Sequence, residues 1–430
     1  MPRPLWATAW RIAGLLLAVV SAGGAALVIR LLYTGRGGEA PIRSAILEQP
    51  LVFLLGVGGL ALGLYVAILP QKILAVRPWL NPRRVWRERR PELFLLLGSC
   101  ALALIVLEIG SRAIYAAQHG FPFFYPVEHI VYPPLYEQLH DYSEDGVNVL
   151  LLGGSVLYFA GRENTLEKAF DIPVRVYNLA QTAHSSRDSL TKYRYALERG
   201  YRFDYVIFYH GINDVRANNV PPELFSKNYN HYFFYRLTNT VFGERNPVLR
   251  FMLNSALIFR IERLVTQLRE TRFFGRSLVH MAFPREDWLQ YGADLKSRAV
   301  FEQNLLEIAR SAEENGSALI VPRFAFHPAL ADYAEGRETG MTEQEIIRFA
   351  EQWGLPGNVA RGIQAHNEVI EMHRDRYTFL DTSRLEEADN FVDPCHFTPE
   401  IQTKFLEFLV DVLRELPTNK AGPRRADTRT

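Results

Sequence analysis

The sequence predicts an α/β domain built on a parallel sheet and preceded by a membrane region. Short apolar runs of strand length alternate with helix-like stretches from residue 146 to residue 416, and polar residues follow the ends of the buried runs. Three long apolar segments occupy the first 115 residues. A chain of 430 residues is long enough for such a membrane region and one domain with a large core.

The apolar segments run from Ile12 to Ile29, from Leu51 to Leu69 and from Leu93 to Ile109. Each approaches the length that crosses a hydrocarbon core of about 30 Å, and we interpret all three as transmembrane helices within a membrane region at 1–115. A cleaved signal peptide is the alternative for the first segment. No clear cleavage site precedes a mature domain, however, and two further spans follow.

Basic residues predict the orientation of these spans. The loop between the second and third spans is rich in arginine, whereas the loop between the first two holds only Arg30, Arg36 and Arg43. Positive residues concentrate on the cytoplasmic side of membranes. The N-terminus is therefore predicted in the cytoplasm, and everything after Ile109 is predicted on the periplasmic, extracytoplasmic side of the inner membrane.

Five strands and five helices are predicted in the domain at 146–416. The strands are expected at 149–152, 174–177, 203–209, 318–322 and 377–380, and the helices at 165–170, 189–199, 301–313, 359–373 and 399–413. Because strands alternate with helices, we expect a parallel sheet with helices on both faces. Functional residues should lie at the carboxyl ends of the strands.

Four short blocks follow the predicted strands or precede the last helix. Gly153-Gly154-Ser155 places a small nucleophile on the tight turn that leaves the first strand. The other blocks are Asn178 to Ser186, Gly211-Ile212-Asn213-Asp214 and Asp393-Pro394-Cys395-His396. Together, and in this order, they resemble the SGNH, or GDSL-like, hydrolase family in a membrane-anchored bacterial form. The resemblance implies a three-layer α/β/α, flavodoxin-like domain.

Two positions depart from the family pattern. The usual Gly-Asp-Ser reads Gly-Gly-Ser here, and Ala183 stands where the family has a glycine that contributes to the oxyanion hole. An alanine can still donate its backbone N–H, provided that its φ is negative, so this departure affects the expected shape of the loop more than the chemistry. The blocks around Asn213 and His396 match without change.

The residue types fit nucleophilic catalysis. Serine is a poor nucleophile at neutral pH, so Ser155 needs a base such as His396, and that imidazole needs an anion such as Asp393 to fix its tautomer. The negative charge on the substrate oxygen needs preorganised donors. The candidates are the backbone N–H groups of Ser155 and Ala183 and the side-chain amide of Asn213.

Composition limits the partners and cofactors. The net charge of +1 shows no overall basic balance, so no nucleic-acid partner is expected. The two cysteines, Cys100 and Cys395, cannot easily pair, because one lies in a predicted membrane span. Cys395 and His396 are adjacent metal-ligand types, but two residues do not make a metal site. We therefore expect no metal and no other cofactor.

Three further segments surround these blocks. Residues 116–145 are rich in aromatic residues and proline and are predicted to form an extended connector. Residues 216–300 are an insertion whose aromatic cluster at 229–235 suggests a cap that binds sugar rings or an acyl chain. The alternative is an insertion with its own small core. The polar tail at 417–430 is predicted to be disordered.

The resemblance implies an extracytoplasmic serine esterase or acyl transferase that acts on ester groups, O-acetyl groups in particular, of a cell-envelope glycan or lipid. A different class of function remains open, namely a non-catalytic binding or assembly component of an envelope polysaccharide system. The substitutions at Gly154 and Ala183 motivate this alternative, and the retained Ser155, Asn213, Asp393 and His396 argue against it.

Overall fold

The computed structural model describes residues 90–160, 165–169, 173–229, 254–259, 286–337 and 342–416, together with Phe242 and Ile261. The chain divides into two compact units, Met1–Gln118 and His119–Thr430. The first unit contains most of α6 (Arg90–His119), and the second contains the sheet.

Helix α6 includes the third predicted membrane span, Leu93 to Ile109. Its C-terminal half carries an ion pair between Glu108 and Arg112, with 2.7 Å between Arg112 Nε and Glu108 Oε1. Within the described residues, no helix is both long enough and apolar enough to cross a bilayer. The predicted transmembrane helix from Leu93 to Ile109, which falls within α6, is therefore not supported. The predicted spans at Ile12 to Ile29 and Leu51 to Leu69 lie outside the described residues.

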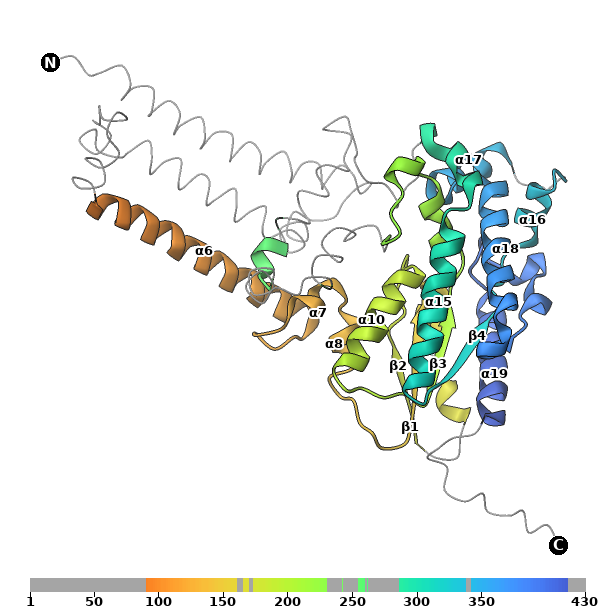
Figure 1. Cartoon of the computed structure of the whole chain (residues 1–430), viewed down its shortest axis with the longest axis horizontal. Coiled ribbons are helices and arrows are strands. Elements are labelled where there is room, and N and C mark those ends of the chain that lie inside the picture. Colours follow the sequence, from red (N-terminus) through yellow and green to blue (C-terminus); the bar gives the residue numbers. More distant parts are fainter. Residues whose placement is uncertain are drawn as a thin grey trace, which may run out of the picture. The chain divides into compact units, whose positions relative to one another are not determined.

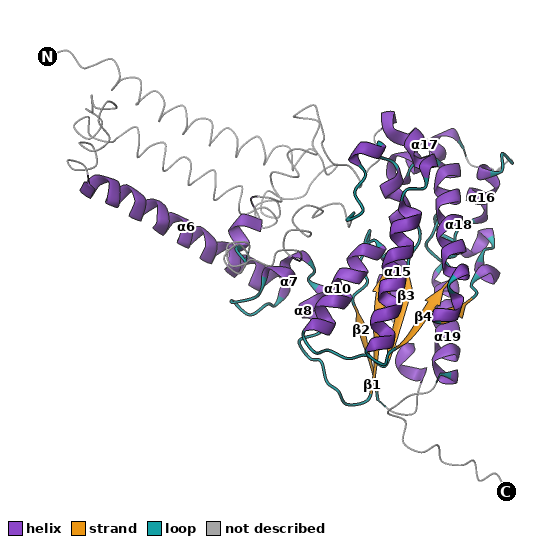
Figure 2. Cartoon of the chain, viewed as in Figure 1, coloured by secondary structure: helices purple, strands orange, loops and turns teal. Residues whose placement is uncertain are grey.

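The second unit is built on a five-stranded sheet in which every pairing is parallel (Figures 1 and 2). Its strands are β1 (Val147–Gly153), β2 (Val174–Asn178), β3 (Tyr205–Tyr209), β4 (Ala318–Pro322) and β5 (Thr378–Leu380). The strand order is β2-β1-β3-β4-β5, the order of flavodoxin-like doubly wound sheets. The predicted α/β class with a parallel sheet is confirmed.

Strand β1 lies inside the sheet, between β2 and β3. In this register Leu151 pairs with both Asn178 and Ile207. All seven residues of β1 are buried, because helices cover both faces of the sheet. This explains why its sequence is a nearly continuous apolar run and lacks a polar alternation.

Consecutive residues of β3 show the two helical layers, because neighbouring side chains of a strand point to opposite faces. The ring of Phe208 lies 6.1 Å from that of Phe301 in α15 (Ser297–Glu314). The ring of Tyr209 lies 5.0 Å from that of Phe405 in α19 (Pro399–Glu415). The helices α15 and α19 therefore cover opposite faces.

The other helices join one of these two layers. Helix α10 (Ser186–Glu198) and helix α18 (Pro356–Met372) both pack against α15 (Figure 1). Helix α9 (Ser155–Ala160) and the 3-10 helix η1 (Leu166–Ala169) pack against α19. The domain is thus a sheet between two helical layers. Because β1, β2 and β3 are parallel neighbours, their carboxyl ends lie at the same edge of the sheet.

Shorter elements fill the connections. Before the sheet come α7 (Val127–Val131) and α8 (Pro134–Glu137). The extended conformation predicted for the connector at 116–145 is therefore wrong over these two helices, because proline also fits the start of a helix, where Pro126 and Pro133 stand. After β3 come α11 (Ile212–Val215), η2 (Arg216–Asn218), η3 (Pro222–Leu224) and η5 (Glu286–Asp294). Between β4 and β5 the chain adds α16 (Pro328–Ala334) and α17 (Glu343–Trp353), and around β5 lie η6 (Arg374–Arg376), η7 (Ser383–Leu385) and η8 (Ala388–Asn390).

The predicted insertion at 216–300 is described only in parts. Residues 216–229, 254–259 and 286–300 belong to the described chain, with Phe242 and Ile261. Of the aromatic cluster at 229–235, Tyr229 alone is described, so the predicted cap lies largely outside the described residues. The tail at 417–430 also lies outside them.

Candidate active site

Ser155, His396 and Asp393 form one chain of hydrogen bonds. His396 Nε2 lies 2.6 Å from Ser155 Oγ, and His396 Nδ1 lies 2.6 Å from Asp393 Oδ2. Ser155 and His396 are 241 positions apart in the sequence. The fold therefore brings together the nucleophile, base and acid that were predicted from separate blocks, within the distances that general-base catalysis requires.

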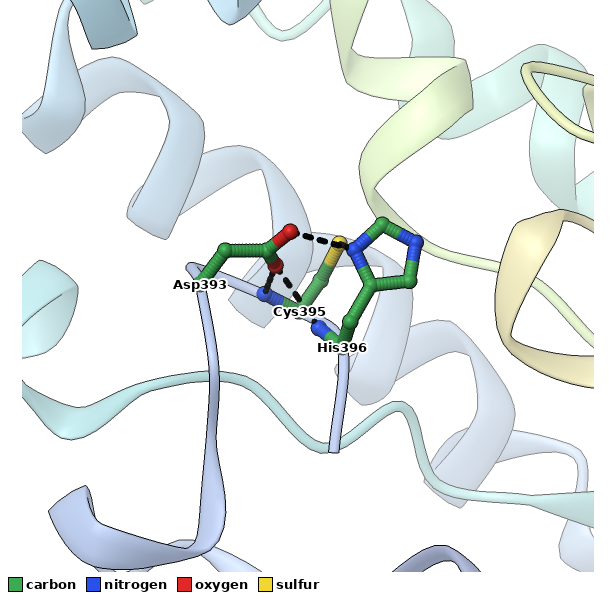
Figure 3. A group of neighbouring side chains, drawn as sticks. All are labelled: Asp393, Cys395 and His396. Atoms are coloured by element: carbon green, nitrogen blue, oxygen red, sulfur yellow. Dashed lines mark hydrogen bonds and ion pairs between the residues drawn. The ribbon is translucent and has the colours of Figure 1, made fainter. Parts of the chain in front are cut away.

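A single loop orients the acid and the base (Figure 3). The Oδ1 atom of Asp393 accepts hydrogen bonds from the backbone N–H groups of Cys395 and His396, both at 2.9 Å, while Oδ2 faces the imidazole. Burial acts to raise the pKa of Asp393, but these hydrogen bonds outweigh it and hold the pKa below its usual value. Asp393 is therefore an anion at neutral pH.

Ser155 begins α9, directly after β1 and the Gly153-Gly154 pair. A Cβ atom added at Gly154 would lie 2.5 Å from Asn213 Nδ2, closer than real side-chain contacts. The glycine thus lets the Asn213 amide approach the backbone beside the nucleophile. The Gly-Gly-Ser departure from the family pattern has a packing reason in this chain.

The segment after β2 runs beside the end of β1. Gln181 N donates to Gly153 O at 3.2 Å, and a turn closes where His184 N donates to Gln181 O at 3.3 Å. Ala183 occupies the third position of this turn with φ +64°. The condition of a negative φ at Ala183 is therefore not met, because a turn of this shape requires a left-handed residue at its third position. Ala183 still carries its backbone N–H in this conformation, so it remains a candidate donor.

Asn213 lies across from this turn. Its Nδ2 donates to the carbonyl of His184 at 3.0 Å, so one hydrogen bond joins the second and third blocks. The preceding Gly211 packs against Phe324, whose Cγ would lie 2.3 Å from an added Cβ. A side chain at Gly211 would therefore displace the start of α11 and the amide of Asn213.

Asp214 also connects the second block (178–186) with the third block (211–214). It is fully buried, and its carboxylate accepts hydrogen bonds from Ser186 N at 2.9 Å and from the hydroxyl of Tyr229 at 2.8 Å. Burial raises the pKa of Asp214 to about 6, whereas the hydrogen bonds from Ser186 and Tyr229 act in the opposite direction. Asp214 thus ties the start of α10 to α11.

Asp393, Cys395 and His396 also present three possible metal ligands, whose ligand atoms lie within 4.8 Å of one another. Sequence reasoning counted only two of them. Burial raises the pKa of the Cys395 thiol well above its usual value, which disfavours the thiolate that binds metals. Both His396 nitrogens already face Asp393 and Ser155. The donor set fits a hydrogen-bonded triad better than a metal centre.

Two cavities flank Ser155 and His396. A cavity of about 10 Å³ lies on the serine side, lined by Gly154, Ser155, Val156, Tyr209, His210, Gly211, Ile212, Asn213, Phe324 and Cys395. A cavity of about 630 Å³ lies on the histidine side, lined by His327, Ala329, Leu330, Glu345, Arg348, Phe349, Gln352, Trp353, Phe391, Val392, Asp393, Pro394 and His396. The second has the size of a small-molecule site.

The walls of the larger cavity come from a segment that sequence reasoning missed. Helices α16 and α17, between β4 and β5, supply most of its lining. A usable signal is present at the start of α17, where Thr342 and Glu345 form a capping box. The predicted cap at 216–300 contributes no residue to this lining within the described chain.

Solved structures overlap the chain only loosely. A GDSL-like lipase from Bacteroides thetaiotaomicron is 11% identical with a TM-score of 0.32, covering 62% of this chain and 85% of its own. An alpha/beta hydrolase enzyme from the metagenome of Lake Arreo is 13% identical with a TM-score of 0.32, covering 63% and 97%. An acetylxylan esterase from Geobacillus stearothermophilus is 13% identical with a TM-score of 0.29, covering 63% and 94%.

No protein-family model and no curated protein sequence matches the chain.

Proposed function

We propose that the protein is a serine esterase or acyl transferase of the SGNH type, with Ser155 as nucleophile, His396 as general base and Asp393 as its orienting anion. The observation that carries the proposal is the continuous hydrogen-bond chain from Ser155 Oγ through His396 to Asp393, with 2.6 Å at each step. An idle binding surface has no chemical need for this arrangement.

The reaction begins when Ser155 Oγ attacks the carbonyl carbon of an ester and His396 Nε2 takes the serine proton. The carbonyl oxygen becomes an oxyanion, which accepts hydrogen bonds from the N–H groups of Ser155 and Ala183 and from the Asn213 amide. His396 then gives its proton to the leaving alcohol, and an acyl-serine remains. Water resolves this intermediate in an esterase, whereas a sugar hydroxyl resolves it in a transferase.

The two cavities support a short acyl group on a larger alcohol. Because His396 protonates the leaving oxygen, the alcohol lies on the histidine side, where the cavity of about 630 Å³ has room for a sugar or another bulky group. The cavity of about 10 Å³ beside Ser155 has room for roughly one water molecule, which a methyl group matches and a longer chain does not. We therefore favour O-acetyl esters of a bulky alcohol, and the proposed extracytoplasmic placement favours a cell-envelope glycan or lipid as the carrier of these esters.

Membrane anchoring forms the second part of the proposal. It rests on the apolar segments Ile12 to Ile29 and Leu51 to Leu69 and on the arginine-rich loop that follows them. Extracytoplasmic placement requires an odd number of spans, so it depends on residues 93–109 as well. A topology reporter fused after Thr430 tests this placement, and activity of the reporter only in the cytoplasm would overturn it.

The catalytic proposal is tested by covalent labelling of the full chain with a fluorophosphonate probe. We expect labelling of the wild type and none of Ser155→Ala or His396→Ala. Ser383→Ala is a matched control on an exposed serine, and it should label as the wild type does. A folded wild type that neither labels nor hydrolyses short esters would favour the non-catalytic binding component instead.

Acyl length is tested on the same protein with 4-nitrophenyl esters. Acetate should be turned over at least about tenfold more efficiently than butyrate, because the longer chain does not fit beside Ser155. Equal efficiency for acetate and octanoate would contradict the assignment of the small cavity to the acyl group.

A further inference from the structure

A lysine lies fully buried beneath the turn that carries Ala183. Lys192 belongs to α10, which begins directly after this turn, and none of its surface is exposed. Lysine is among the residue types that are almost never fully buried unless they are paired. The catalytic steps proposed for the triad do not use this side chain, so its burial needs another reason.

The amine of Lys192 contacts both ends of the segment 179–184. Its Nζ donates a hydrogen bond to the carbonyl of Leu179, where the segment begins. The same Nζ lies 2.9 Å from Nδ1 of His184, where the segment ends. One side chain therefore bridges the two ends of the loop that contains Ala183.

His184 connects this lysine with the second side of the oxyanion hole. Its backbone carbonyl accepts the hydrogen bond from Asn213 Nδ2 at 3.0 Å. A shift of His184 would consequently move the acceptor that orients the Asn213 amide. The contacts run without a gap from Lys192 through His184 to Asn213.

We propose that Lys192 is a positioning residue for the oxyanion hole, which holds the loop 179–184 directly and orients the Asn213 amide through His184. This inference rests on the proposed function, because it assigns Lys192 to the transition state of that reaction. Lys192 does not touch the substrate; it acts through the backbone of the loop.

The surroundings of the amine explain why a lysine fits here. The ring of Tyr132 lies 5.6 Å from Nζ, and the hydroxyl of Tyr132 donates to Asp188 Oδ1 at 2.6 Å. The titratable groups around the amine are His184 of the loop, Tyr132 before the sheet, Asp188 of the same helix and His210 after β3. No apolar side chain can donate to the carbonyl of Leu179 and to His184 together.

The amine performs this role in both of its protonation states. Burial lowers the pKa of Lys192 to about 7, against the attraction of Asp188. The neutral amine still carries two N–H donors, one for Leu179 and one for His184. The loop is thus held across neutral pH, and the contribution of Lys192 is geometric.

The test compares Lys192→Met with Tyr193→Phe in the full chain, using 4-nitrophenyl acetate. Tyr193 is the next residue of α10 and is also buried, with its ring 6.5 Å from that of Phe203. We expect kcat of Lys192→Met to fall roughly 10- to 100-fold with KM unchanged within about twofold, as for a loss of alignment in the transition state. Tyr193→Phe should leave both constants within about twofold of the wild type.

A role in folding alone would lower the amount of active protein and with it the apparent kcat, also at unchanged KM. Active sites are therefore counted by fluorophosphonate labelling, and kcat is given per labelled site. If Lys192→Met does not fold, His184→Ala provides the test, because it removes the imidazole contact and keeps the backbone carbonyl. We expect a smaller fall in kcat per labelled site, again at constant KM. Lys192→Gln, which restores an NH2 donor group on a shorter side chain, should recover part of the lost rate.

Three results would overturn the inference. A folded Lys192→Met, or His184→Ala in its place, with kcat within about twofold of the wild type would overturn it alone and leave the proposed function intact. A folded wild type without turnover and without serine labelling would overturn the proposed function, and the inference with it. Hydrogen exchange of residues 179–184 should be faster in Lys192→Met than in Tyr193→Phe, and equal exchange would also contradict it.

Discussion

Asp393 and His396 lie in one loop after β5, and the hydrogen bonds that orient them join residues within three positions of each other. Their side chains are 43% and 23% exposed. The opposite side of the site is built differently. Its loop and α11 are held by Lys192, Asp188 and Asp214, all fully buried. One half of the site is a local motif near the surface, and the other half is part of the core.

This difference separates the expected effects of substitutions. A change at the exposed acid removes a catalytic group and leaves few buried groups without partners, so rate should fall with little loss of stability. A change in the buried half leaves polar groups unsatisfied inside the protein, which affects stability as well as rate. Rate and stability measured together therefore test the comparison.

The largest effect is expected for Asp393→Asn. The amide oxygen stays with the backbone N–H groups of Cys395 and His396, so the amide NH2 faces His396 Nδ1. The imidazole loses its anion and its preferred tautomer, and kcat should fall roughly 10⁴-fold. The melting temperature should change little, because Asp393 is half exposed. Steady-state kinetics and thermal unfolding measure the two effects. Asp389→Asn, at an exposed acid of the preceding helix η8, is the matched control.

An Asp393→Asn variant that kept more than about a tenth of the wild-type kcat would contradict the triad. If Asp393→Asn lowered the melting temperature strongly, the loop of Asp393 and His396 would contribute to the stability of the core, and the proposed difference between the two halves of the site would be wrong.

Asn213→Ala should have the second largest effect. Loss of one oxyanion donor lowers kcat by roughly 10² to 10³-fold at nearly constant KM. The carbonyl of His184 also loses its donor, so the free energy of unfolding should fall by about 1 kcal/mol. Kinetics and denaturant unfolding on one preparation measure both. A loss of rate without any loss of stability would contradict the comparison, because Asn213 would then behave like the exposed Asp393.

Lys192→Met should change how stability depends on pH. The unfolded lysine has a pKa near 10.5 and the folded one near 7, so the unfolded chain binds more protons between these values. The stability of the wild type therefore gains from this group as pH rises from about 7 to about 10, by an amount on the order of a few kcal/mol. Lys192→Met lacks this gain. Denaturant unfolding at pH 7 and at pH 9.5 measures it.

Groups that lie far from Lys192 also titrate over this range, but they are common to both proteins and cancel in the difference. Parallel stability curves for the wild type and Lys192→Met would contradict the burial of a lysine with a lowered pKa.

The same comparison explains what the sequence predicts. The alternation of strands and helices predicted the parallel sheet, because β1 is buried on both faces and reads as an apolar run. The spacing of Asp393 and His396 predicted an interaction, because a turn of three residues brings the carboxylate to the imidazole. Both features depend on residues that are near one another in the chain.

The buried half could not be predicted in this way. In the sequence, Lys192 cannot be told from an exposed lysine on a helix. Its burial depends on tertiary packing, in which Tyr132 and α10 lie against the loop 179–184. The cavity walls of α16 and α17 were missed for a similar reason. The cavity forms where α17 meets the loop of His396, and these are far apart in the sequence.

The φ of Ala183 also depends on contacts between residues that are distant in the sequence. A negative φ is the default for alanine, yet the hydrogen bonds of Gln181 to Gly153 and of His184 to Gln181 fix a turn that needs a left-handed residue. The contacts between β1 and the loop determine this conformation, and the identity of the residue does not.

The smallest effect is therefore expected for Ala183→Gly. The left-handed region costs an alanine about 1 to 2 kcal/mol and costs a glycine nothing, while the added freedom of glycine in the unfolded chain takes back about 0.4 to 1 kcal/mol. The variant should be more stable by roughly 0.5 to 1 kcal/mol. Its N–H keeps its place, so kcat should stay within about twofold of the wild type. Denaturant unfolding and steady-state kinetics measure both.

Gly200→Ala is the matched control with the opposite sign. Gly200 follows α10 with φ +86°, and an added Cβ would meet no atom within 4 Å. Alanine there gains about 1 to 2 kcal/mol of backbone strain and regains about 0.4 to 1 kcal/mol through the reduced freedom of the unfolded chain. The free energy of unfolding should therefore fall by roughly 0.5 to 1 kcal/mol. If Ala183→Gly and Gly200→Ala shift stability in the same direction, the left-handed conformation of Ala183 is wrong. If Ala183→Gly is more stable but much slower, the strained alanine itself fixes the direction of its N–H.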